Sequence, residues 1–290
     1  MFSARKKAMG IALLTAGIVA ATAGTASASA APAAIAGWTL NSSSVVTTAT
    51  GGEGLTTVAG GWVHYAGLLT IPLQQRLEGW AHIGDPDYAK GYLFDAYQGA
   101  DTATSKMYLV TTPSGAQYEY VHTLAAGEQL NNSFDTISPD GQWMVSGEWD
   151  TMNRLLVFPT PILNSATPAK GGALNLSGQI TLDHPVRNVQ GCDFVTATRL
   201  LCTSDDPNTD LWPTSKQLLQ VDLPGPLTGA TVTGHVTSLG QVPLDPNLCT
   251  GTYETEGIDY DVPRGILRLE VIPPPICGDL LTNVYSYTAS

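Results

Sequence analysis

Short apolar segments recur along the chain and are separated by turn-forming sequences such as SPDG at 138–141. None shows a sustained helical period, and the 30 Gly and 19 Pro residues leave little uninterrupted length for a helix. The segments are rich in β-branched and aromatic residues, as strands are. They are YLFDAY (92–97), KMYLVTT (106–112), YEYVHTL (118–124), WMVSGEW (143–149), RLLVFPT (154–160), KQLLQVDL (216–223), HVTSLGQV (235–242), GILRLEVI (265–272) and NVYSYTA (283–289). This pattern predicts an all-β protein.

An internal repeat narrows the architecture. Each repeat has a polar opening residue, a small residue, an apolar residue and, in three of four cases, Asp, followed by a turn and a second strand. The repeats open at Glu78, Asn132, Gln190 and Glu256, with spacings of 54, 58 and 66 residues. That length fits one four-stranded blade of a β-propeller. We expect a β-propeller of about five blades, with four or six as alternatives and a β-sandwich as the second choice.

The N-terminus has the pattern of a secretory signal peptide. Three basic residues precede an apolar run, and small residues at 26–30 offer cleavage sites. The run is too short to favour a membrane span. We expect residues 1–30 to be a signal peptide, 31–37 a disordered segment and 38–290 a single propeller domain, secreted and without membrane insertion.

The predicted mature chain is strongly acidic. Loss of the three basic leader residues moves the formal charge from −12 to −15. Such a charge makes nucleic acid an unlikely partner, because nucleic-acid binding needs a basic surface.

Four cysteines remain in that mature chain, and an even number in an exported protein favours disulfides. Cys192 and Cys202 flank DFVTATRLL, which reads as a hairpin that would place them opposite one another. We therefore expect one disulfide between Cys192 and Cys202, and a second between Cys249 and Cys277 that closes a longer loop.

Two segments carry a resemblance to known proteins. ISPDGQWMVSGEW (137–149) and EGIDYD (256–261) resemble the inner-strand signatures of secreted β-propellers. The Glu-Gly opener resembles the strand start in the gluconolactonase, paraoxonase and diisopropyl-fluorophosphatase group, in which residues from different blades hold a catalytic calcium. That resemblance implies that Glu78, Asn132, Gln190 and Glu256 form a calcium site, although Gln190 departs from the usual ligand types.

A calcium ion in such a site would suit hydrolysis of a small ester or lactone. His82 is then the nearest candidate for a general base, with Asp259 or Asp135 as its alternative or orienting partner. The competing interpretation is that the openers only bond backbone groups at the start of each inner strand, and that Asp135, Asp193 and Asp259 are structural aspartates of turns or of contacts between blades.

Aromatic residues near predicted strand ends suggest a different function. Rings such as that of Trp212, in the loop DLWPTS, could stack on sugar faces. The sequence therefore leaves two functions: a calcium-assisted hydrolase, and a non-catalytic extracellular propeller that binds a glycan, a small molecule or a protein partner.

Overall fold

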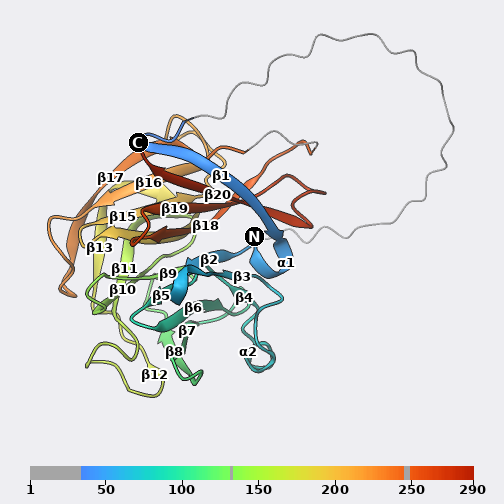
Figure 1. Ribbon diagram of the computed structural model, residues 1–290. Helices are drawn as coiled ribbons and strands as arrows, with labels where there is room; N and C mark the ends of the chain where they lie inside the picture. Colours follow the sequence, from blue (N-terminus) through green and yellow to red (C-terminus); the bar gives the residue numbers. More distant parts are fainter. Residues whose placement is uncertain (1–33, 131–132, 245–248) are drawn as a thin grey trace, which may run out of the picture. The chain divides into compact units, whose positions relative to one another are not determined.

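The computed structural model describes residues 34–130, 133–244 and 249–290, so the predicted signal peptide at 1–30 lies outside the described residues. Figure 1 shows a chain built almost wholly of strands. The helical elements are short: α1 (Thr48–Gly51), the 3₁₀ turn η1 (Ala59–Gly61) and α2 (Leu73–Glu78). None of the described helices has the length and apolar character needed to span a membrane.

The strands form four sheets. One has the order β1-β20-β19-β18, comprising β1 (Trp38–Thr47), β20 (Leu281–Ala289), β19 (Ile266–Ile272) and β18 (Glu254–Asp261). The largest has the order β14-β15-β16-β17-β13-β11-β10-β9, comprising β14 (Val189–Thr196), β15 (Arg199–Ser204), β16 (Gln217–Asp222), β17 (Val232–Gln241), β13 (Gly178–Arg187), β11 (Thr151–Pro159), β10 (Trp143–Ser146) and β9 (Asp135–Ile137).

A third sheet has the order β12-β8-β7-β6-β4, with β5 also paired to β6. It comprises β12 (Gly172–Ala173), β8 (Gln117–Thr123), β7 (Ser105–Thr111), β6 (Tyr92–Gln98), β4 (His82–Ile83) and β5 (Asp87–Ala89). The last sheet pairs β2 (Gly54–Thr57) with β3 (Val63–Ala66).

Five strands contact one another in a closed circle. β2 contacts β5, β5 contacts β9, β9 contacts β14, β14 contacts β18, and β18 returns to β2. A circle of inner strands, each followed by further strands of its own sheet, is the architecture of a β-propeller, so the predicted fold class is confirmed and the β-sandwich alternative does not apply. The number of blades stays a prediction, because β2–β3 has only two strands and β13 pairs with β17 to merge two four-stranded sheets.

The chain closes the circle with its first strand. β1 pairs antiparallel with β20, so Trp38 lies opposite Ala289 and Thr47 opposite Leu281. Figure 1 shows these two strands, from the two ends of the sequence, side by side. Residues before β1 are also held: Ile35 is only 3 % exposed, and the Ala36 amide donates to the Leu239 carbonyl at 2.8 Å. The disorder expected for 31–37 therefore does not extend to these residues.

The main apolar core fills the space between the β9–β13 and β14–β17 halves of the large sheet. It includes Phe134, Leu155 and Ile180 from one half and Leu200 and Leu219 from the other. Both predicted disulfides are confirmed. Cys192 and Cys202 are direct partners on β14 and β15, and Cys249 bonds Cys277. Two disulfides are typical of a protein from an oxidising compartment.

Candidate functional site

The inner strands share a local pattern of two positions separated by one residue, and the second position is polar. The pairs are Gly54 and Thr56, Asp85 and Asp87, Ser133 and Asp135, Gly191 and Asp193, and Gly257 and Asp259. The first position is a small residue in every strand except one, where Asp85 stands in place of the glycine that three other strands have. The sequence predicted that the first repeat opens at Glu78. That residue ends α2, however, and the inner strand of the β4–β8 sheet begins after Gly84.

Asp85 joins the inner strands at the centre of the fold. Its carboxylate accepts the amide of Leu55 on β2 at 2.9 Å and the amide of Ile258 on β18 at 3.0 Å. Its own amide donates to the Ser133 carbonyl, and its carbonyl accepts the amide of Asp135. A Cβ added at Gly54, Gly191 or Gly257 would lie within 2.5 Å of Asp85, so only glycine lets these strands approach it.

The next aspartates along the inner strands bond neighbouring strands in the circle. The Ile137 amide of β9 donates to Asp87 at 2.6 Å, and the Tyr260 amide of β18 donates to Asp193 at 2.5 Å. Asp259 accepts the amide and the hydroxyl of Thr57 at 2.8 and 2.7 Å. These bonds fix the three carboxyl groups in position, because each is held by backbone of another strand.

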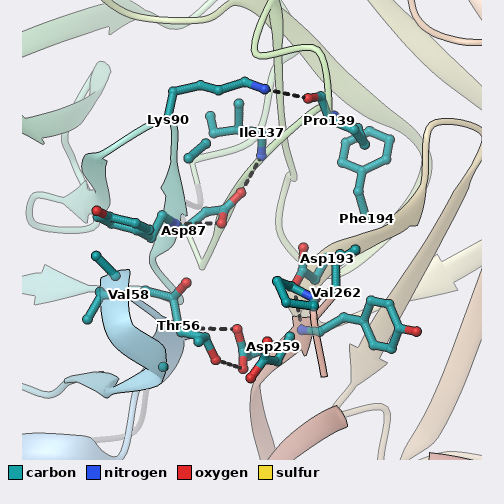
Figure 2. Close-up of a pocket in the computed structure, with 18 of the residues that line it drawn as sticks. Thr56, Val58, Asp87, Lys90, Ile137, Pro139, Asp193, Phe194, Asp259 and Val262 are labelled. Atoms are coloured by element: carbon teal, nitrogen blue, oxygen red, sulfur yellow. Dashed lines mark hydrogen bonds between the residues drawn. The ribbon is translucent and has the colours of Figure 1, made fainter. Parts of the chain in front are cut away.

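The same aspartates line an open cavity of about 720 Å³ at the C-terminal ends of the inner strands. All five strands of the circle contribute, and Figure 2 shows Asp87, Asp193 and Asp259 reaching it from three of them. Beside the carboxyl groups stand the rings of Tyr88 and Phe194. The cavity has the size of known small-ligand sites, roughly 300–1,000 Å³.

This cavity, lined by all five inner strands, is the axial cavity of the propeller, and its rim carries two cationic side chains. Lys90 is exposed and donates from Nζ to the Pro139 carbonyl at 3.0 Å (Figure 2). Arg264 donates from Nη1 to Asp261 at 3.0 Å. The cavity therefore combines an acidic interior with a basic rim.

Burial controls the charge of the carboxyl groups in the cavity wall. It raises the pKa of Asp87 to about 6, against the opposing effect of two backbone hydrogen bonds, and the nearby charge of Asp259 adds to the rise. Burial also raises the pKa of Asp193 well above its usual range, and the charges of Asp87 and Asp259 add to it. The three groups are close enough to influence one another, so their protons are lost in linked steps.

The predicted calcium ligands do not come together as a set. Glu78 is exposed and accepts a hydrogen bond from Gln74 within α2. Asn132 lies outside the described residues. Gln190 and Glu256 directly precede Gly191 and Gly257, which are two of the glycines that lie against Asp85. No group of three or more His, Cys, Asp or Glu that could hold a metal ion is found in the described part of the chain.

The three predicted catalytic residues lie in different surroundings. His82 on β4 is 3.7 Å from Glu53, and burial lowers its pKa. Asp135 is 1 % exposed and does not line the cavity, and neither of its carboxylate oxygens has a hydrogen-bond partner among the described residues. Asp259 is engaged by Thr57 and, at 2.6 Å, by Arg268. The contacts of Asp193 and Asp259 therefore agree with the competing interpretation, in which these aspartates bond neighbouring blades.

Sequence reasoning missed Glu53, which opens β2 with the same Glu-Gly pair as Glu256. Burial raises the pKa of Glu53 to about 8, and the charge of Glu254 adds to the rise. Glu270, on β19, is 0 % exposed, and within the described part of the chain neither of its carboxylate oxygens has a hydrogen-bond partner. Burial, followed by the charge of Glu53, raises its pKa well above the usual range. The repeated Glu-Gly pair at 53–54 was the signal that would have found Glu53.

The aromatic candidate Trp212 is packed rather than free to stack on a ligand. It contacts the main apolar core, and its ring centroid lies 4.1 Å from that of His184. The exposed tryptophan is Trp62, at 78 %.

Comparisons with known proteins add little beyond the fold. No family model matches the chain, and no curated protein sequence matches it. Among solved structures, it is similar to native arabinanase Arb43A of Bacillus subtilis, with 13% identity, coverage of 78% of this chain and 81% of that chain, and a TM-score of 0.41. A DUF4623 family protein of Bacteroides eggerthii has 12% identity, 89% and 78% coverage, and a TM-score of 0.39.

The Swd1 β-propeller domain of Myceliophteria thermophila is also similar, with 12% identity, 62% and 48% coverage, and a TM-score of 0.30. At such identities and scores these likenesses carry no argument about function. The fold is established by the closed circle of inner strands, and the function has to be argued from the site.

Proposed function

We propose that the protein is an exported β-propeller that binds a glycan in the axial cavity. The observation that carries this proposal is the convergence of all five inner strands on one open cavity of about 720 Å³, lined by carboxyl groups and aromatic rings. Sugars present hydroxyl groups around the edge of the ring and C–H groups on its faces. A site for them therefore needs both acceptors and rings.

The carboxyl groups retain the capacity to accept such hydroxyls. Each oxygen of Asp87 accepts one backbone amide, from Tyr88 or Ile137. Because a carboxylate offers about four lone-pair sites, each oxygen can accept a further hydrogen bond. Asp193 likewise holds one amide at 2.5 Å and a distant Thr136 hydroxyl at 3.5 Å. Both side chains are half-buried, so their acceptors are fixed before a ligand arrives.

Binding to a glycan array, followed by calorimetry on the best ligand, tests this function. Asp87→Asn and Asp193→Asn keep an acceptor for the backbone amide but replace the second carboxyl oxygen by an NH2 donor, and we expect each to weaken binding about tenfold. Asp101→Asn, at an exposed position away from the cavity, is the matched control. Absence of any glycan signal for the wild-type protein, or equal binding by all three variants, would reject the proposal.

Calcium-assisted hydrolysis of an ester or lactone remains a second candidate. Its support is the approach of His82 to Glu53 and the position of Glu256 on the neighbouring inner strand. The described residues do not provide a complete metal site, so no catalytic step is derived through calcium. Thermal stability and hydrolysis of a lactone and aryl-ester panel, measured with calcium and with chelator, decide the question. Identical results in both conditions would remove this candidate.

A further inference from the structure

Trp62 directly follows residues 58–61, which line the axial cavity, and its side chain is strongly exposed. At 78 % exposed it leaves most of its ring in water, whereas tryptophan is on average well buried in proteins. An exposed ring of this kind is available to pack against a ligand.

The backbone before Trp62 is held against the cavity. Residues 58–61 line the cavity and lead directly into Trp62. The Val58 amide donates to the Trp62 carbonyl at 2.8 Å, and the Gly61 amide donates to the Val58 carbonyl at 3.0 Å. These two bonds close a tight loop, so the backbone position of Trp62 is fixed relative to the cavity wall.

The loop also packs on the opposite side of the rim. A Cβ added at Gly61 would lie 2.0 Å from Nη2 of Arg264, so the guanidinium rests directly against this glycine. Both Gly60 and Gly61 have φ of 80°, a conformation that glycine adopts without strain. Arg264 is itself held by Asp261. The loop and Arg264 therefore support one another at the mouth of the cavity.

From this arrangement we infer that Trp62 binds a sugar unit beyond the mouth of the cavity, so that the ligand is an oligosaccharide or polysaccharide chain rather than a single sugar. The inference rests on the proposed function. A chain seated in the cavity would leave through its open side, past the loop that ends at Trp62. The indole offers a flat apolar face to the C–H face of that outer unit and a ring N–H to its hydroxyls.

The test compares ligand length. Arabino-, xylo- and cello-oligosaccharides of one to six units are titrated by calorimetry into wild-type protein, Trp62→Ala, Trp62→Tyr and Leu77→Ala. Leu77, at 79 % exposed on α2, is a control of equal exposure on an element that contributes no residue to the cavity wall. We expect wild-type affinity to rise with chain length. Trp62→Ala should lower the affinity for the longest chain about tenfold, with little change for the single sugar, and Trp62→Tyr should retain most of it.

The outcomes separate the two proposals. If wild-type protein binds no member of the panel, the glycan function itself fails and this inference fails with it. If wild-type protein binds but affinity does not increase beyond one unit, or Trp62→Ala weakens all lengths equally, the function stands and the role of Trp62 is wrong. An effect of Leu77→Ala as large as that of Trp62→Ala would also overturn it.

Discussion

Two contacts between neighbouring groups of strands differ in the kind of side chain that they bury. Between the β9–β13 and β14–β17 halves of the large sheet, the packing is apolar and includes Leu155 and Leu219. Between β18–β19 and β2, charged and polar groups meet: Arg268 bonds Asp259 and Thr57, and Glu270 is buried with no hydrogen-bond partner in the residues that the structure describes. Apolar packing is non-directional and independent of pH, whereas the polar contact depends on each charge keeping its partner or proton.

The difference shows where the fold is vulnerable. The apolar contact follows from burial of surface and tolerates small shifts. The polar contact attaches the β2–β3 sheet to β18–β19. β2–β3 is the only two-stranded sheet that the structure describes, and the hydrogen bonds of this contact come from few residues. We therefore expect mutations and pH to act differently at the two places.

The largest effect is expected from Arg268→Ala. This change leaves Asp259 buried beside Thr57 without its cation, and loss of one partner from a buried pair costs about 3–5 kcal/mol. Urea unfolding measures it, with Arg199→Ala as control, because the exposed Arg199–Asp222 pair should contribute less than about 1 kcal/mol. Equal losses in the two variants would show that the polar contact is not needed.

Truncation of the apolar contact by Leu155→Ala comes next. Leu155 is 1 % exposed, and the cavity left behind should lower the free energy of unfolding by about 2–5 kcal/mol. Because no charge is involved, the loss should be the same at pH 5 and pH 8. A loss that changed strongly with pH would mean that the two contacts are coupled.

The pH dependence of the wild-type protein is the third expectation. The folded-state pKa values of Asp87, Asp95 and Glu53 are raised to about 6, about 7 and about 8, mainly by burial. A raised carboxyl pKa contributes stability that is complete below the unfolded value, near pH 4, and is lost as pH rises through the folded value. The free energy of unfolding should therefore fall as the pH rises from 5 to 8.

Denaturant titrations across this range provide the measurement. Carboxyl groups with lowered pKa, such as Glu128 at about 2, stay ionised in both states over this interval and do not change the slope. Stability that rises from pH 5 to pH 8 would contradict the assignment of protons to the buried carboxyl groups.

The smallest effect is expected from Glu270→Gln. The substitution removes a buried carboxyl group that has no hydrogen-bond partner among the described residues and whose raised pKa makes its ionisation costly. Because that cost grows as pH rises, we expect the gain in the free energy of unfolding, at most about 1–2 kcal/mol, to be larger at pH 8 than at pH 5. Glu78→Gln, on the exposed face of α2, is the matched control. A loss of stability in Glu270→Gln at both pH values would show that the carboxylate has a partner after all.

The sequence by itself determined the local features of this protein. Strand-forming segments and turns are properties of neighbouring residues, so alternation such as that of 266–272 predicted the strands directly. The pairing of Cys192 with Cys202 followed from a hairpin of short sequence separation. The repeat predicted the propeller, because inner strands of one architecture need similar residues at similar positions.

Tertiary structure alone decided which residues meet at the centre. Asp85 takes a position that holds glycine in three other strands, so it does not match the common repeat pattern, which predicted Glu78 as the first opener instead. Glu53 and Asp193 acquired their surroundings from strands remote in sequence. Closure of the circle is the physical reason. Contacts between strands of different sheets depend on how those sheets pack, and local sequence patterns do not encode which strands of remote sequence become neighbours.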